Sequence, residues 1–444
     1  MQALISAVDK HCNLILDAER RIWSHPETGF KEFKTSAYMA EQFEALGYKL
    51  TYADGITGFY TCIDTGREGP ELLILGELDS IICPSHKDSD STTGAVHACG
   101  HNAQCAALLG IAAALTEEGA LDGLCGRIRL CAVPAEELLE LEYRRKLKEQ
   151  GKIKYFGGKS EFLSRGYFDG VDLAFMVHTA SRYGIKQGMV GCLSKNIIYK
   201  GKSAHAGSSP WEGKNALYAA TCGINAANAL RETFRDADLI RFHPIITRGG
   251  EIVNAIPERV KIESYVRGKT FEAIENANKR IDQALCGAAL SLDVNVEIID
   301  IPGYSPLVND KGMSAVAREA FEMVLPDAEL LDIPEYSTGS SDMGDLSSIM
   351  PIVHPICGGA SGTAHGNDFE ISSPEDACVN SAKWQLAMLK LLLGENAERA
   401  KKIISDFKPV FASKEEFLAH LDSLNREGDR ITYKEDGTAE VSLK

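Results

Sequence analysis

Several features that mark specialised classes of protein are scarce in this sequence. Only 3 of its 444 residues are Trp, and aromatic residues make up 7% of the chain. No apolar run reaches the ~18 residues that a membrane-spanning helix requires. Positive charge is in deficit, because 47 Lys and Arg residues stand against 63 Asp and Glu residues, for a net charge of −16. Neither a membrane span nor a nucleic-acid or anionic-membrane partner is therefore expected.

The cysteines and the first residues bear on where the protein works. The 12 cysteines form no C-x-x-C pair, and the opening MQALISAVDKHCNLILDAERR has the pattern of a charged amphipathic helix and not of a signal peptide. We therefore expect a reduced, cytoplasmic protein. The most basic stretch, residues 143–148, is flanked and interrupted by glutamates, which is typical of a solvated helix face.

The remaining composition is that of a large globular protein. Hydrophobic residues make up 44% and charged residues 25%, so the chain can bury a sizeable core. At ~100 to 200 residues per domain, the length suits two domains or one large domain with an insertion.

Two patterns of secondary structure divide the chain. Short apolar runs alternate with helical stretches, which predicts an α/β domain with a mostly parallel central sheet; the runs are residues 71–79, 127–133, 172–178 and 350–356. Residues 192–301 instead follow the order β-α-β-β-α-β of a ferredoxin-like unit. We therefore predict a discontinuous catalytic domain, residues 1–191 and 302–394, an inserted domain, residues 192–301, and a helical C-terminal extension, residues 395–444.

Polar side chains follow the apolar runs, where α/β proteins place their sites. The first run ends in Glu77 and Asp79, the second leads to Glu136-Glu137 and the third ends in His178. Thiolate, imidazole and carboxylate together form the ligand set of zinc and its neighbours. The candidate ligands are Cys99, His101, Glu137, His178 and His365.

Five ligands exceed the three of a mononuclear catalytic zinc site, so two metal ions ~3.5 to 4 Å apart fit this set better. Glu136 is then left as a general base beside the metals. Glu77 and Asp79 follow a buried strand, and we expect them to contact a ligand histidine from outside the metal site. Taken singly, a Cys-x-His pair or two adjacent glutamates is more often structural, and it is the shared position at strand ends that favours a site.

Seven short motifs occur in order over about residues 20–390. They are Ser24-His-Pro-Glu-Thr-Gly-Phe30, Gly76-Glu-Leu-Asp79, His97-Ala-Cys-Gly-His-Asn102, Pro134-Ala-Glu-Glu137, Gly201-Lys-Ser-Ala-His-Ala206, Asn254-Ala-Ile-Pro-Glu258 and the final His365. This series resembles the dinuclear-metal aminoacylase and carboxypeptidase family, peptidase family M20. Within the family it is most similar to the amidohydrolases that cleave hippurate, indole-acetyl amino acids and aminobenzoyl-glutamate.

The resemblance implies a two-domain fold in which the inserted unit is a lid and dimer interface. It implies two divalent metal ions, zinc or manganese, held by the five candidate ligands, with Glu136 as the base. It further implies that His205 reaches into a neighbouring subunit's site to stabilise the oxyanion, and that Asn254 and Arg267 hold the substrate carboxylate.

The chain also departs from the family pattern. Asn102 stands where many amidohydrolases have Asp, and Glu77 stands where others have His or Asp. After Glu137 the usual glycine-rich stretch is replaced by the charged segment 138–154, which lies where substrate access is controlled. These departures bear on the substrate more than on the chemistry.

We therefore predict a metal-dependent amidohydrolase that cleaves the amide bond of N-acyl amino acids with metal-activated water. We expect it to be a homodimer and to act on small molecules. Two alternatives stay open. One is a dipeptidase or aminopeptidase, in which Glu77 or Asp342 would meet the free substrate amine. The other is a non-catalytic relative that only binds carboxylate ligands.

Overall fold

The computed structural model describes residues 2–443; Met1 and Lys444 lie outside it. The chain forms a mixed α/β structure of two compact units. Within the described residues, unit 1 comprises residues 2–188, 307–336 and 341–414, and unit 2 comprises residues 189–306, 337–340 and 415–443. The core of unit 2 lies within a few residues of the predicted insertion, but the sequence did not indicate that the C-terminal residues belong to the same unit.

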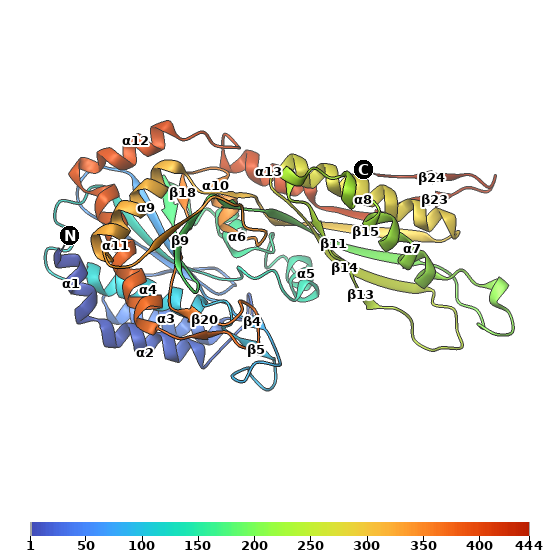
Figure 1. The fold of residues 1–444 in the computed structure, drawn as a ribbon, viewed down its shortest axis with the longest axis horizontal. Coiled ribbons are helices and arrows are strands. Elements are labelled where there is room, and N and C mark those ends of the chain that lie inside the picture. Colours follow the sequence, from blue (N-terminus) through green and yellow to red (C-terminus); the bar gives the residue numbers. More distant parts are fainter. Residues whose placement is uncertain (1, 444) are drawn as a thin grey trace. The chain divides into compact units, whose positions relative to one another are not determined.

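Unit 1 is built on a six-stranded sheet in the order β1-β2-β6-β3-β7-β18 (Figure 1). The strands are β1 (Thr51–Tyr52), β2 (Phe59–Asp64), β6 (Arg127–Val133), β3 (Glu71–Glu77), β7 (Leu173–Phe175) and β18 (Ile352–Val353). The pairs β6/β3, β3/β7 and β7/β18 are parallel, whereas β1/β2 and β2/β6 are antiparallel. Every residue of β3 is buried, because helices cover both faces of a central parallel strand.

Helices complete the core of unit 1. Every residue of α4 (His101–Leu115) is buried, as expected for a helix that is apolar on all sides. Residues near the start form α1 (Gln2–Lys10), α2 (Cys12–Trp23) and α3 (Phe33–Ala45). Helices α1 and α2 are separate because the backbone is not helical at His11.

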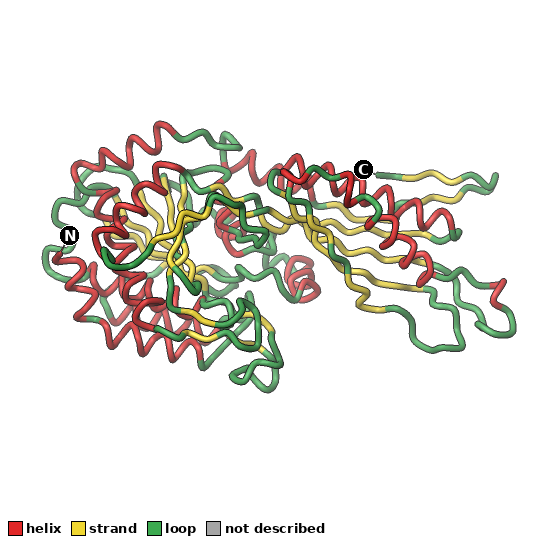
Figure 2. Tube along the Cα trace, in the orientation of Figure 1, coloured by secondary structure: helices red, strands yellow, loops and turns green. Residues whose placement is uncertain are grey.

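Unit 2 contains an antiparallel sheet and helices, which Figure 2 distinguishes by colour. Its order is β12-β14-β11-β15-β22, with β13 also paired to β14. The elements are β11 (Gly191–Lys200), α7 (Ala216–Asn228), β12 (Arg241–Phe242), β13 (Ile245–Arg248), β14 (Arg259–Gly268), α8 (Phe271–Ser291) and β15 (Asn295–Tyr304). Burial alternates along β14, so one face of the strand packs on α7 and α8.

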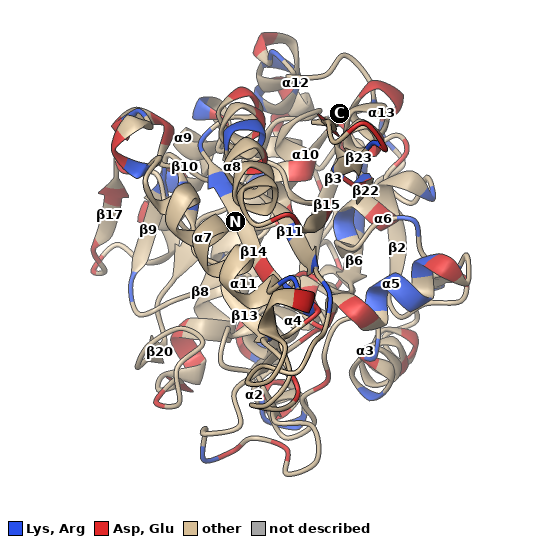
Figure 3. Cartoon of the chain, turned by 90° about the vertical axis from the view of Figure 1, so that its right-hand side faces the viewer, with Lys and Arg blue, Asp and Glu red and all other residues tan. Residues whose placement is uncertain are grey.

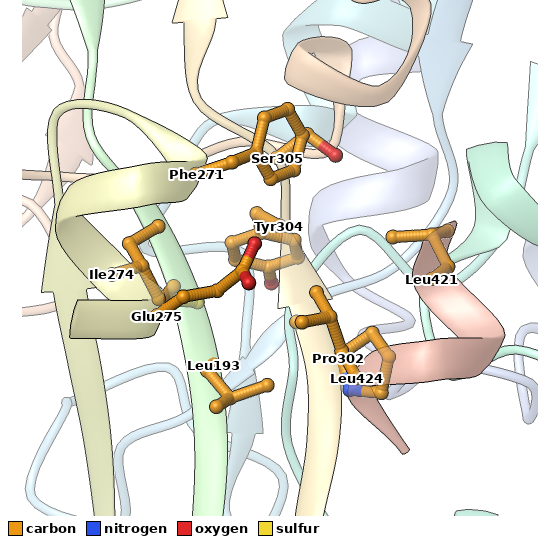
Figure 4. A pocket seen from close by; sticks show the side chains of 11 residues that line it. Leu193, Phe271, Ile274, Glu275, Pro302, Tyr304, Ser305, Leu421 and Leu424 are labelled. Atoms are coloured by element: carbon orange, nitrogen blue, oxygen red, sulfur yellow. The ribbon is translucent and has the colours of Figure 1, made fainter. Parts of the chain in front are cut away.

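The C-terminal extension is not helical throughout, and this part of the sequence prediction was wrong. After α12 (Glu398–Asp406) and α13 (Lys414–Leu424) come three short strands, β22 (Arg426–Asp429), β23 (Ile431–Tyr433) and β24 (Ala439–Val441). Strand β22 pairs with β15, a partner far away in sequence, so local patterning gave no signal of it. Leu421 and Leu424 of α13 line a pocket with Leu193 and Ile274 (Figure 4), so the extension packs on the unit it completes.

Two further observations bear on the class of protein. The twelve cysteines all lie within residues 2–443, and none of them forms a disulfide. Within residues 2–443, no helix has both the length and the apolar character that crossing a lipid bilayer requires.

Candidate metal centre

The predicted site residues of unit 1 meet where strands of the sheet end. Glu77 is the last residue of β3, and β6 is followed by Pro134-Ala135 before Glu136. Ala135 adopts a φ of 56°, and its N–H donates to Glu32 Oε1 at 2.8 Å. Burial, and secondarily the charge of Asp79, raise the pKa of Glu32 to about 8. The turn that presents Glu136 is thus held by a buried carboxyl group.

Two groups of potential metal ligands share one thiol. Cys99, His101 and His178 form the first group, and Cys99, Glu137 and His365 form the second; within each group the ligand atoms lie within 4.8 Å of one another. Cys99 Sγ lies 3.5 Å from His178 Nε2, and His365 Nε2 lies 2.9 Å from Glu137 Oε1. The structure therefore brings together all five residues that the sequence singled out.

The histidine rings are oriented as metal ligands are. His178 Nδ1 lies 2.7 Å from the carbonyl oxygen of Thr179, and His101 Nδ1 lies 2.9 Å from that of Asp79. Donation from Nδ1 to a carbonyl leaves each Nε2 as a lone-pair donor. His101 Nε2 is buried without a well-directed hydrogen bond, although Glu77 Oε2 lies 3.2 Å away. A thiol, imidazoles and carboxylates with such a buried lone pair fit a divalent transition metal.

Electrostatics favour the ligand forms of Cys99 and Glu137. Burial opposes ionisation of Cys99, but His101 and His178 outweigh it and lower the pKa of the thiol to about 6. Burial likewise opposes ionisation of Glu137, yet its contact with His365 lowers the pKa of this carboxyl group. Hydrogen bonds with Cys99 and Glu137 raise the pKa of His365 to about 10.

Glu136 differs from its neighbour. It is buried, and burial, followed by the charges of Glu77 and Glu137, raises its pKa well above the usual value. Glu136 also lies near Glu77 and His101, with which it forms a third cluster of potential ligand atoms. A carboxyl group with a raised pKa beside a metal site can both accept and release a proton.

Asp79 connects the two ligand groups. One of its carboxylate oxygens accepts from the backbone N–H of Glu137 at 2.8 Å, and the other lies 3.3 Å from His101 Nδ1. A single buried carboxylate therefore contacts one residue of each group. This arrangement orients ligands from outside the metal site.

Glu77 has a partner that the sequence did not reveal. Lys159 Nζ lies 2.5 Å from Glu77 Oε1 and also pairs with Asp342, and all three side chains are fully buried. Burial opposes ionisation of Glu77, but Lys159 and then His101 lower its pKa to about 2. Both carboxylates that could have met a free substrate amine are therefore engaged by an internal cation.

The other predicted residues, His205, Asn254 and Arg267, belong to unit 2. His205 is exposed, and its Nδ1 accepts the backbone N–H groups of Gly207 and Ser208, so Nε2 carries the proton and can donate. The backbone carbonyl of Asn254 accepts from the backbone N–H of Ala206, the residue after His205, at 2.9 Å.

Arg267 differs from a structural strand arginine in one respect. Its Nη1 donates to Ser340 Oγ at 2.9 Å, and no carboxylate within residues 2–443 forms an ion pair with it. The guanidinium therefore keeps its charge available to a ligand.

Comparisons with known proteins identify the family of the chain. Residues 74–391 match the family described as peptidase family M20/M25/M40. Human Xaa-Arg dipeptidase is 27% identical over 429 residues, which cover 90% of this chain and 90% of that protein. Indole-3-acetyl-aspartic acid hydrolase of Enterobacter agglomerans is 26% identical over 336 residues, covering 63% of this chain and 72% of that protein.

A solved structure shares the fold. It is a dinuclear metal-binding peptidase of family M20 from Bacillus subtilis, with a TM-score of 0.63 and 20% identity, covering 88% of this chain and 99% of that chain. The resemblance expected from the motifs is thereby confirmed, and the family match spans most of the chain. The chain is an amide-bond hydrolase that belongs to peptidase family M20/M25/M40.

Proposed function

We propose that this protein hydrolyses the amide bond of small N-acyl amino acids, using two divalent metal ions held by the two ligand groups that share Cys99. The observation that carries the proposal is this shared thiol, flanked by two histidines on one side and by Glu137 and His365 on the other, with Glu136 close by. Divalent ions bound there would supply Lewis acidity and activate water. Zinc and manganese are the candidates that suit the donor set.

The chain's own residues then take separate parts. Glu136 removes a proton from the attacking water and delivers it to the leaving nitrogen. His205 donates from Nε2 to the oxyanion that develops on the carbonyl, and Arg267 with Asn254 holds the substrate carboxylate. The test is release of amino acid from a panel of N-acyl amino acids and dipeptides with added manganese or zinc; release from no member would refute the proposal.

A dipeptidase is the second candidate, because human Xaa-Arg dipeptidase is among the relatives. A dipeptide differs from an N-acyl amino acid by a free amine, which would seek a carboxylate. Lys159 already engages Glu77 and Asp342 in the interior of unit 1, which supports the uncharged acyl group over the free amine. We expect N-acetyl or aromatic N-acyl amino acids to be cleaved with higher kcat/KM than the matching dipeptides.

We further propose that unit 2 is a ferredoxin-like lid through which the protein forms a homodimer. Strand β22 covers one edge of its sheet, whereas β13 at the other side of the sheet has four exposed residues, including Ile245 and Ile246. An exposed apolar edge strand favours pairing with another chain. The free thiols support a reducing, cytoplasmic location.

Mixing two inactive variants tests whether His205 acts in the neighbouring subunit. His205→Ala and Glu136→Gln should each lower turnover by about 100-fold or more, and a mixed dimer should contain one site with both residues intact. Random exchange predicts recovery of roughly a quarter of wild-type activity. If the mixture stays inactive although light scattering and mass tags show mixed dimers, His205 does not act across subunits.

Replacement of Arg267 tests the substrate carboxylate. Arg267→Met should raise KM for N-acyl amino acids by ~10 to 100-fold, since a charge-assisted contact contributes about 1.5–3 kcal/mol. With wild type, conversion of the substrate carboxylate to an amide should raise KM by the same factor. With Arg267→Met, the same conversion should change KM little. Equal sensitivity of both enzymes to the amide would exclude this contact.

A further inference from the structure

The segment that follows Glu137 leaves the candidate metal centre and then returns to it. Residues 138–156, here named the excursion, leave the site directly after Glu137 and include α5 (Leu141–Glu149). The chain returns at Gly158, whose N–H donates to the carbonyl of Ala135 at 3.1 Å. A Cβ on Gly158 would collide with the carbonyl oxygen of Pro134, so the return is tight against the turn that carries Glu136. The two ends of the excursion thus flank Glu136 and Glu137.

Arg144 of α5 turns inward from this otherwise charged helix. In the cartoon of Figure 3, α5 is coloured as a mixture of basic and acidic residues, yet Arg144 is 1% exposed. Its Nη2 donates to the backbone carbonyl of Glu137, and its Nη1 donates to that of Phe156 at 2.5 Å. Within residues 2–443 it forms no ion pair with a carboxylate. Besides the two carbonyls, the guanidinium lies over the ring of Phe30, 5.5 Å from its centroid. Burial of a guanidinium without a carboxylate partner is costly, which indicates a structural or functional role for Arg144.

The neighbouring loop is shaped to receive Arg144. Gly29 packs directly against its Nη2, and a Cβ at Gly29 would collide with that nitrogen and press on Ala135. Glu140 accepts from Lys31 Nζ at 2.6 Å and from Thr28 Oγ1 at 2.5 Å, which anchors the start of α5 on the same loop. The guanidinium is therefore fixed from two sides, by the excursion and by residues 28–31.

The backbone of Glu137 is consequently held by a charged group on each side of its Cα. Its N–H donates to the Asp79 carboxylate at 2.8 Å, and its carbonyl accepts from Arg144. We infer that Arg144 is a positioning residue, which fixes Glu137 as a ligand of the second metal group and so makes the excursion part of the metal centre. This inference rests on the proposed function only in taking Glu137 as a metal ligand.

The inference predicts a selective defect. Arg144→Met removes the charged donor to the carbonyl of Glu137 and leaves the N–H of Leu139, at 2.8 Å, to hold that carbonyl. Glu137 belongs to the Cys99, Glu137 and His365 group, so the Cys99, His101 and His178 group is untouched. Affinity for one of two ions should fall by ~10 to 100-fold, the usual effect of removing an outer partner of a ligand. Zinc titrated alone against a chromophoric chelator should show about two sites in wild type and one weakened site in the variant.

Arg145→Met is the matched control, because Arg145 is the next residue of α5, is half exposed and pairs with Glu149 at 3.1 Å. It should bind both ions as wild type does. Arg144→Lys should recover part of the lost affinity, because an ammonium can still donate to the Glu137 carbonyl. Cobalt substitution gives a second readout, since a shifted Glu137 should change the visible absorption of one ion.

Three results decide the inference. Weakening of one ion in Arg144→Met, with wild-type binding in Arg145→Met, supports it, and unchanged zinc affinity in folded Arg144→Met overturns it. If Arg144→Met fails to fold, Gly29→Ala decides, since a methyl group there displaces the guanidinium without removing it and should weaken the same ion. A wild-type protein that binds zinc but cleaves no amide would refute the proposed function and leave this inference standing.

Discussion

Glu136→Gln should lower kcat by about 10²–10⁴-fold while leaving metal content and folding intact. The amide keeps the shape of the side chain but cannot accept the proton of water. Folding should be preserved because burial and the neighbouring carboxylates already disfavour the ionised form of Glu136. The measurement is amino-acid release at saturating substrate, together with metal analysis and thermal unfolding of the same preparation.

The control for this variant is Glu136→Asp, which keeps the carboxyl group and withdraws it by one methylene. It should retain more activity than the amide, since proton transfer survives at poorer geometry. Turnover by Glu136→Gln close to that of wild type would remove Glu136 from the role of base.

Lys159→Met should have the largest effect on stability. It leaves Glu77 and Asp342 buried without their cation, and removal of one partner of a buried ion pair costs about 3–5 kcal/mol of unfolding free energy. Urea unfolding of the metal-free protein measures this cost without interference from metal binding. Lys31→Met is the matched control, because Lys31 pairs with Glu140 near the surface and should contribute about 0–1 kcal/mol.

A double variant separates charge compensation from packing. In Glu77→Gln with Lys159→Met the remaining Asp342 can take up a proton, since burial raises its pKa to about 7 although Lys159 opposes this. The double variant should therefore be more stable than Lys159→Met alone. If Lys159→Met unfolds at the same urea concentration as wild type, the buried cation has no stabilising role.

The elements that carry the site were predictable because their signals are local. The apolar run at residues 127–133 forms β6 with those bounds, and the carboxylates that follow the strands lie where a parallel sheet gathers them. The cysteine and histidines were recognised by residue type, since few combinations besides a metal site place a thiol and imidazoles at strand ends.

The supports of the site were not predictable because they depend on contacts distant in sequence. Lys159 lies 82 residues from Glu77 and 183 residues from Asp342 along the chain, and nothing in a lysine near two glycines indicates full burial. Residues 143–148 were interpreted as a solvated helix face; four of the six are at least partly exposed, but Arg144 and Leu147 are buried. A charged side chain on such a helix can be buried when a carbonyl accepts its hydrogen bond and a glycine leaves room for it.

The central claim is that two divalent ions sharing Cys99 make this chain an amide hydrolase, and metal content measured on active protein tests it most directly. We predict about two ions per chain in wild type that releases amino acid from an N-acyl substrate, and loss of both ions with loss of activity in Cys99→Ala, because that thiol belongs to both groups. Active protein with well under one ion per chain, or Cys99→Ala that keeps both ions, would contradict the account.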